Sequence, residues 1–162
     1  MCKADQVKRI HIVMDETCFQ IVGEPAPNKV HPNNIVDAQF SAYYQAAASW
    51  LYGDAQGWAI YDRANDPAVH ALCDKIIIEG RRLSNDLITT MTVTLQDGQT
   101  QEMTLERPKG QQPERPPTNA EVVQKFRSLA THVLGNEKVE KVVEFVTGRL
   151  EIPVANLIGV LA

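Results

Sequence analysis

The sequence is poor in the residues and patterns that mark the commonest functional sites. Its 162 residues include only three cysteines, Cys2, Cys18 and Cys73. They have no C-x-x-C spacing and no neighbouring histidine pair, which argues against a zinc site and a disulfide framework, so a reduced cytoplasmic compartment is the simpler interpretation. The sequence also lacks the G-x-G-x-x-G, Walker, H-E-x-x-H and G-x-S-x-G motifs, and each gap removes a common class of enzyme.

Basic charge and long apolar runs are scarce as well. Sixteen Lys and Arg against twenty Asp and Glu give a net charge of −4, and nucleic-acid binders are usually basic, so no nucleic-acid partner is expected. The longest charge-free stretch, residues 38–53, contains Gln39, Ser41, Gln45 and Ser49 and is shorter than the roughly 20 apolar residues that a membrane span needs. No apolar signal-peptide core precedes it. The pattern predicts a soluble protein without a membrane partner.

What the sequence does contain is the composition and periodicity of one globular domain, with 44% apolar and 22% charged residues. Residues 7–14 alternate between apolar and polar types, which predicts a half-buried strand. Asp97-Gly98 between two alternating segments predicts a hairpin. The other expected elements are strands at 17–22 and 75–79, helices at 38–51, 68–74, 118–135, 136–148 and 153–161, and loops at 23–34 and 107–117.

This order of elements predicts an α+β fold, a two-layer domain with a mainly antiparallel sheet and helices packed on one face. Thr118 and Glu121 fit a capping box at the start of a helix, and Asp66-Pro67 fits another helix start. Because the segment after the 107–117 loop is too short for an independent domain, residues 1–162 are expected to form a single domain.

One group of residues suggests chemistry. If residues 38–51 and their lead-in are helical, Asp37, Ser41 and Tyr44 lie at i, i+4 and i+7, on one side of a helix otherwise without charge. A loop with Lys29 and His31 leads into its N-terminal end, where anions are favoured. A small carboxylate could be held there by the helix end, Lys29 and a tyrosine hydroxyl, and a tyrosine could donate a proton.

The same residues have a structural interpretation, which composition and spacing alone favour. Asp37 can be only a helix cap, Ser41 can bond back to its helix, and Tyr43 or Tyr44 can be core aromatics with satisfied hydroxyls. The three remaining histidines are expected to be surface or hydrogen-bonded structural residues: His11, His70 and His132.

Four landmarks follow one another along nearly the whole chain. They are Asp5–Ile12, similar to an "edI-x-x-I-x-v" strand; Pro32 to Tyr44, similar to a "P-…-dAqFS-x-x-Y" helix; Asp66-Pro67-x-Val69 leading to Lys75-Ile76; and Asp97-Gly98 followed by Pro108-Lys109-Gly110 and the Pro117–Phe126 helix start. In order and spacing they resemble the C-terminal domain of the MmgE/PrpD family, the 2-methylcitrate dehydratase-like proteins.

This resemblance implies a specific chemistry. Family members dehydrate 2-methylcitrate, decarboxylate cis-aconitate or epimerise iminodisuccinate, by acid–base catalysis without an iron–sulfur cluster, so no cofactor or metal is expected. They pair a large helical domain with a smaller α+β domain, and the active site lies between the two. The resemblance implies that Tyr44 faces this cleft as the catalytic residue, and we expect Lys29, His31 and Ser41 to bind a small di- or tricarboxylate.

The sequence also departs from the family's pattern. The helical domain and its principal acid–base residues would precede residue 1, and the lysine and histidine before the first strand are missing. We therefore expect a detached second domain, inactive alone, that completes a lyase or isomerase with a separate helical chain. The alternative is a non-catalytic stand-alone domain that binds a small carboxylate or a protein partner.

A domain without its usual partner should expose an apolar surface, so we also expect a homo-oligomer, a dimer. The candidate interfaces are residues 154–161 and the alanine-rich helix, with Trp50 or Trp58 as anchors.

Overall fold

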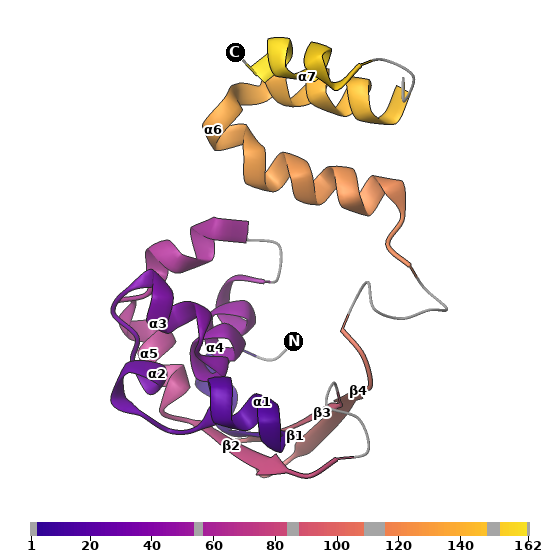
Figure 1. Cartoon of the computed structure of the whole chain (residues 1–162). Coiled ribbons are helices and arrows are strands. Elements are labelled where there is room, and N and C mark those ends of the chain that lie inside the picture. The colour runs from indigo at the N-terminus through magenta and orange to yellow at the C-terminus, as the bar shows by residue number, and fades with distance from the viewer. Residues whose placement is uncertain (1–2, 54–56, 84–87, 109–115, 149–152, 162) are drawn as a thin grey trace. The chain divides into compact units, whose positions relative to one another are not determined.

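The computed structural model describes residues 3–53, 57–83, 88–108, 116–148 and 153–161 (Figure 1). Its contacts divide the chain into two compact units, Met1–Pro116 (unit 1) and Pro117–Ala162 (unit 2). Cys2, the Lys109-Gly110 part of the fourth landmark and most of the expected 107–117 loop lie outside the described residues.

Unit 1 contains the sheet and the shorter helices. In chain order its elements are η1 (Ala4–Gln6), β1 (Val7–Asp15), α1 (Glu16–Cys18), η2 (Phe19–Gly23), α2 (Pro27–Val30), α3 (Ile35–Gln39), α4 (Ala42–Tyr52), η3 (Gly57–Arg63), α5 (Pro67–Cys73), β2 (Ile76–Arg81), β3 (Thr89–Leu95) and β4 (Thr100–Leu105). Here η1 and η3 are 3₁₀ helices and η2 is a single π-helical turn.

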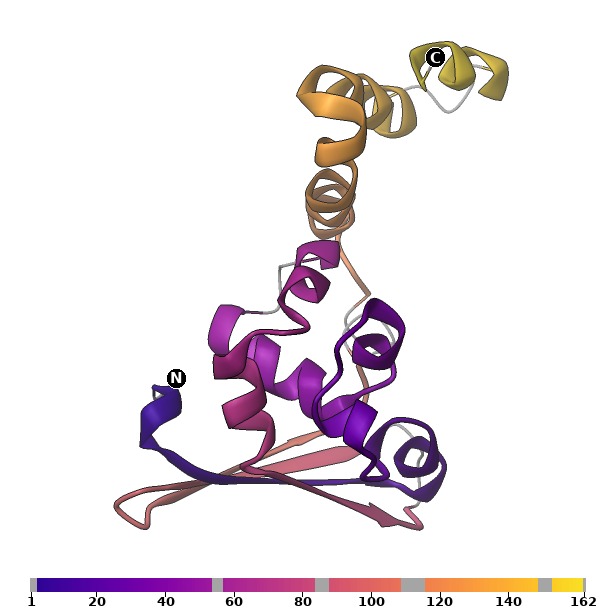
Figure 2. The ribbon, with the colours of Figure 1, turned by 90° about the vertical axis from the view of Figure 1, so that its left-hand side faces the viewer.

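The sheet has the strand order β2-β1-β3-β4. β1 and β2 are parallel, with Ile10 opposite Ile76, while the β1–β3 and β3–β4 pairs are antiparallel. The chain between the two parallel strands forms the crossover and supplies helices α1 to α5, which lie on one side of the sheet (Figure 2). The α+β prediction is therefore confirmed, with a mixed sheet in which antiparallel pairs predominate.

The core of unit 1 lies between this sheet and the helices. Alternate β1 residues, Ile10, Ile12 and Met14, are buried against the helical layer together with Ile76 and Ile78 of β2. The intervening residues lie on the other face, which is partly exposed and mostly polar, with Val13 and Ile77 as its apolar members. On that face His11 Nε2 lies 3.2 Å from Glu79 Oε2, and Thr92 Oγ1 lies 3.0 Å from Glu102 Oε2.

The strongest local signals are confirmed. Asp97 and Gly98 form the tip of the β3–β4 hairpin, where Gly98 has a φ of 88° and its N–H donates to the Leu95 carbonyl at 3.0 Å. Asp66 caps α5 by accepting from the Ala68 N–H at 2.9 Å. The capping box is also present, because the Thr118 N–H donates to Glu121 Oε2 at 2.9 Å.

The expected strand at 17–22 is wrong, because this segment turns into α1 and then η2. Asp15 begins the turn by accepting a hydrogen bond from the Thr17 N–H at 2.9 Å. Phe19 then packs on β2 at Gly80, where a Cβ would lie only 2.7 Å from the phenylalanine ring. The segment is thus held over β2 by a contact that its own sequence does not reveal. The expected loop at 23–34 also contains one short helix, α2.

The expected helix over residues 38–51 is divided in two. α3 ends at Gln39, and Ser41, with φ −117° and ψ 109°, begins α4 as its N-cap. Asp37 therefore lies on a different helix from Tyr44, and the i, i+4, i+7 stripe is wrong. Phe40 at the break is 53% exposed, while Ala47 and Ala48 of the alanine-rich helix are buried in the core of unit 1.

Unit 2 consists of α6 (Asn119–Gly148) and α7 (Val154–Leu161). Gly135, with a φ of 76°, breaks α6 where the sequence predicted a helix end. Arg127 and Glu140 join the two halves through hydrogen bonds of 2.6 and 2.7 Å. No helix within the described ranges is long and apolar enough to cross a membrane.

Candidate functional site

The segment from α2 to α4 is shaped by two polar side chains at helix starts. Asn34 caps α3 by accepting from the Asp37 N–H at 3.0 Å, and its amide also donates to Asp37 Oδ2 at 2.6 Å. Ser41 caps α4 by accepting from the Tyr44 N–H at 2.9 Å. The expected role of Asp37 as a helix cap is therefore wrong, because Asn34 is the cap, while the Asp37 carboxylate accepts from Asn34 and, at 2.8 Å, from the Asn28 amide of α2.

Ser41 ties α4 to α2. It is fully buried, and its hydroxyl donates to the backbone carbonyl of Lys29 while it accepts from Tyr44. Both hydrogen-bonding directions of the hydroxyl are thus used inside the protein. Ser41 fixes the positions of Lys29 and Tyr44 through backbone contacts, and its oxygen is not turned toward solvent.

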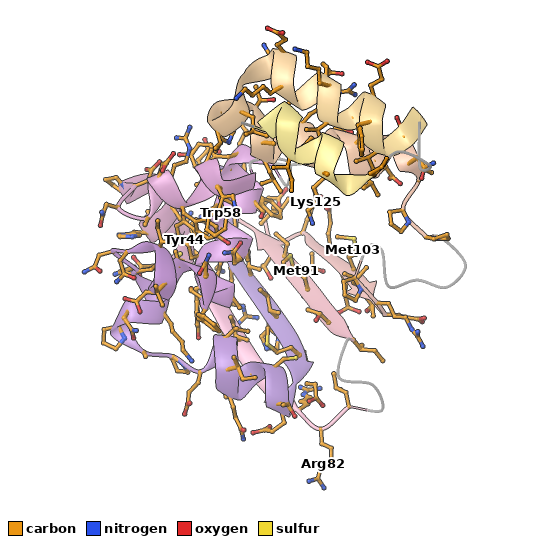
Figure 3. All side chains as sticks on the ribbon, turned by 45° about the horizontal axis from the view of Figure 1, so that its top comes forward. Tyr44, Trp58, Arg82, Met91, Met103 and Lys125 are labelled. Carbon is orange, nitrogen blue, oxygen red and sulfur yellow. The ribbon has the colours of Figure 1, made fainter. Side chains whose placement is uncertain are left out.

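Tyr44 lies within the helical layer of unit 1 (Figure 3). Its side chain is fully buried, and its hydroxyl donates to the backbone carbonyl of Ile60 in η3. Burial raises the pKa of Tyr44 to about 12, with smaller contributions from nearby Cys73 and Tyr61. In this conformation the phenol is a weaker acid than free tyrosine, and its proton is committed to a carbonyl.

Aromatic rings continue from Tyr44 to the surface. The Tyr61 ring lies 6.5 Å from that of Tyr44, and the Trp58 ring lies 5.5 Å from that of Tyr61. Trp58 is exposed on η3. η3 therefore covers Tyr44 with the Ile60 carbonyl and the Tyr61 ring, and Trp58 packs on Tyr61 in turn.

Lys29 and His31 place their charge-bearing groups nearer to solvent. Lys29 Nζ lies 3.4 Å from the carbonyl of Gln20, a neutral acceptor, so this contact leaves the ammonium charge unneutralised. His31 is exposed, and its Nε2 lies 2.8 Å from Asp74 Oδ1. Of the four predicted site residues, these two can reach a ligand without any change in the core.

A second histidine, His70 of α5, belongs to the same cluster. Its ring stacks on that of His31 with centroids 4.8 Å apart, and its Nε2 lies 2.7 Å from the Ala64 carbonyl. We expected His70 to be a hydrogen-bonded structural residue, and this contact agrees. Sequence reasoning did not join His70 and Asp74 to His31, although their i, i+4 spacing places them on one face of a helix.

The four predicted residues thus form two groups. Ser41 and Tyr44 are interior groups linked to the backbone of Lys29, whereas the Lys29 ammonium and the His31 imidazole lie outside. A shallow pocket is found elsewhere, lined by Asp5, Gln6, Leu95, Gln96 and Asp97, and its two carboxylates do not suit an anion.

The described residues argue against a nucleophilic cysteine and against a metal site. Burial raises the pKa of the Cys73 thiol to about 12, so it stays protonated at neutral pH. No group of three or more His, Cys, Asp or Glu in the described part of the chain could hold a metal ion.

The fold defines an α+β domain with two layers. A mixed sheet is covered on one side by short helices, and one of these helices, capped by Ser41, carries Tyr44. The family model for the MmgE/PrpD C-terminal domain matches residues 2–148, which extend from unit 1 into unit 2. The chain therefore belongs to the MmgE/PrpD family. No curated protein matches it.

Proposed function

We propose that this domain forms one wall of an active site for lyase or isomerase chemistry on small polycarboxylates, completed by a helical domain. The observation that carries the proposal is family membership over residues 2–148. Because the match extends across unit 1 and into unit 2, we propose that residues 1–162 act as one family domain. A cytoplasmic location and the absence of a cofactor belong to the same proposal.

Lys29 and His31 are the proposed contacts for the substrate carboxylates. The Lys29 ammonium has only a carbonyl neighbour at 3.4 Å, and His31 can add positive charge when it is protonated. Each contact exposed to water contributes at most about 1 kcal/mol. Binding of a dicarboxylate to this domain alone is therefore weak, and a second domain would strengthen it by excluding water.

Tyr44 is the proposed proton donor, supported by Ser41, which orients the first turn of α4. The Tyr44 hydroxyl can donate a proton to a substrate only after its hydrogen bond to the Ile60 carbonyl is broken. The proposal therefore includes a displacement of η3 when the helical domain and substrate are bound. One tyrosine beside Lys29 and His31 does not make an acid–base pair, so we expect the chain alone to be inactive.

The test is complementation of the full chain. We expect no turnover of 2-methylcitrate or cis-aconitate by the chain alone, and turnover after addition of a helical MmgE/PrpD domain, measured by following substrate and product by NMR. Tyr44→Phe should lower kcat at least tenfold, whereas Lys29→Ala should mainly raise KM. Lys8→Ala is the matched control, since Lys8 is an exposed lysine on β1. Turnover by the chain alone, or an inactive complex, would contradict the proposal.

A non-catalytic domain that binds a small carboxylate or a protein is the second candidate. It is favoured by the Tyr44 hydroxyl, which is satisfied inside the core, and by the pairing of His31 with Asp74. In that case Tyr44→Phe changes stability but not ligand affinity, while Lys29→Ala still weakens carboxylate binding.

A further inference from the structure

β4 is the strand at one edge of the sheet, and within the described residues no strand pairs with its outer side. β4 is the last strand in the order, and every residue from Thr100 to Leu105 is exposed. Within the described residues, β3 pairs with one side of β4 and no strand pairs with the other. Natural edge strands are usually blocked by proline, lysine or a bulge, and β4 contains neither residue type and pairs with β3 without a register shift.

The opposite edge differs. At β2, Phe19 of η2 packs on Gly80, and Arg81 forms a two-bond contact with Glu79 at 2.7 and 3.1 Å. The Phe19 contact lies on the helix-side face of β2, because a Cβ at Gly80 would point off the sheet, so the charged pair of Arg81 and Glu79 is the feature of this edge that discourages strand pairing. β4 carries one charged residue, Glu102, against these two, and it is therefore the less protected edge of this sheet.

The hairpin geometry determines which β4 groups point outward. The Leu95 N–H donates to the Gln99 carbonyl at 2.8 Å, which makes Leu95 and Gln99 a hydrogen-bonded pair. Such pairs alternate along an antiparallel ladder, so Gln101, Met103 and Leu105 direct their backbone groups toward β3. The N–H and C=O groups of Thr100, Glu102 and Thr104 then point toward the open edge.

Side-chain contacts agree with this alternation. The side chains of non-hydrogen-bonded pairs approach each other more closely. Thr90 Oγ1 lies 2.9 Å from Thr104 Oγ1, and Thr92 Oγ1 lies 3.0 Å from Glu102 Oε2. Both are pairs that the ladder assigns as non-hydrogen-bonded.

We propose that β4 pairs antiparallel with β4 of a second copy of this chain, with Met103 opposite Met103. In this register Glu102 lies opposite Thr104 of the second copy in a hydrogen-bonded pair, so the charged Glu102 faces a neutral residue. If the second copy is shifted by two residues in one direction, Glu102 lies opposite Glu102 of that copy. If it is shifted by two residues in the other direction, Glu102 lies opposite Glu106 of that copy. Like charges directly opposite each other are destabilising, so charge selects the Met103 register. This inference is independent of the proposed chemistry.

Apolar burial favours the same partner. Met103 is 70% exposed and Leu105 is 47% exposed, on the helix-side face of the sheet. Met103 extends this face from Met91, its partner on β3 (Figure 3). Pairing of two copies would bring both Met103 side chains together and place Leu105 opposite Gln101. The result would be a continuous eight-stranded sheet in which the outward backbone groups of β4 are satisfied.

Sedimentation of the full chain tests the proposal. We expect the wild type and Met103→Leu to be dimers, and Met103→Lys to dissociate with at least a tenfold larger dissociation constant, because two lysines would face each other. Mixing Met103→Lys with Met103→Glu should restore the dimer. Circular dichroism of each variant checks the fold, which should not change because Met103 is exposed.

Disulfide trapping tests the register. Met103→Cys should cross-link under mild oxidation, since a non-hydrogen-bonded pair has Cα atoms about 4.5 Å apart, within disulfide range. Thr104→Cys is the matched control. In the proposed register Thr104 lies opposite Glu102 of the second copy, so the two introduced cysteines are offset by two residues along the strands and should not cross-link. The wild type under the same oxidation reports any reaction of the native cysteines.

Four results would overturn the proposal. They are a monomeric wild type, a dimer that Met103→Lys leaves intact, equal cross-linking at positions 103 and 104, and open-ended aggregates in place of a dimer. An intact Met103→Lys dimer would assign the interface to another surface, such as the expected residues 154–161.

Discussion

Ile78→Ala is expected to lower the free energy of unfolding by about 2–5 kcal/mol, while Ile77→Ala lowers it by about 1 kcal/mol or less. The two isoleucines are adjacent in β2 and lose the same atoms. Ile78 is 7% exposed and lies against the helical layer, whereas Ile77 is 49% exposed on the opposite face. Only the Ile78 substitution leaves a cavity in the core.

Urea unfolding followed by circular dichroism measures both variants against the wild type, and Ile77→Ala serves as the control for strand propensity. Similar losses for the two variants, or a larger loss for Ile77→Ala, would contradict the assignment of faces. Because the side-chain period of a strand is two residues, such a result would mean that β2 lies one residue out of its described register.

Tyr44→Phe is expected to lower the free energy of unfolding by about 1–3 kcal/mol, because it removes a buried hydrogen bond and leaves the Ile60 carbonyl with one partner fewer. Tyr61→Phe is the control and should cost less, since Tyr61 is only partly buried and its hydroxyl accepts a 3.3 Å bond from Gln45. An unchanged stability in Tyr44→Phe would mean that the hydroxyl is not held by Ile60 in solution.

Tyr44 should also make the free energy of unfolding depend on pH. The folded state raises the pKa of Tyr44 from 10 to about 12, so its neutral phenol stabilises the fold. This contribution is fully present below pH 10 and is lost as the pH rises toward 12. Tyr44→Phe should therefore lose less stability than the wild type across this range. Some alkaline loss should remain, because burial also raises the pKa of Tyr43 and hydrogen bonding to Asp66 raises that of Tyr52.

Elements whose signals are local could be predicted from the sequence. The alternation of residues 7–14 became β1, Asp97-Gly98 became the hairpin tip, and Asp66 and Thr118 became helix starts. In each case the hydrogen bonds or side-chain alternation that define the element are contained within a few residues. Family membership was also predicted, because its landmarks are spread over both units.

Elements that depend on distant contacts could not be predicted. Residues 17–22 have the composition of a strand, but Phe19 packs on Gly80, about sixty residues further along the chain. The break before α4 depends on the Ser41 hydroxyl, which reaches back to the carbonyl of Lys29. In both cases a tertiary contact overrides a reasonable local pattern.

The candidate site was predicted only in part. Sequence order placed Lys29, His31, Ser41 and Tyr44 near one another, and the structure joins Ser41 and Tyr44 to the backbone of Lys29. Spacing alone does not say whether a hydroxyl points to solvent or to the core, and the Tyr44 hydroxyl bonds to a carbonyl of η3. The stacking of His31 on His70 requires the packing of α5, which no local pattern encodes.

Titration of the full chain with citrate, followed by amide chemical shifts, tests the central claim most directly. The account predicts weak, saturable shifts at millimolar ligand, clustered in residues 29–44 and reaching His70 and Asp74. Lys29→Ala should abolish these shifts and Lys8→Ala should preserve them. The absence of shifts at millimolar citrate, or shifts confined to the far end of the sheet, would contradict a polycarboxylate site on this domain.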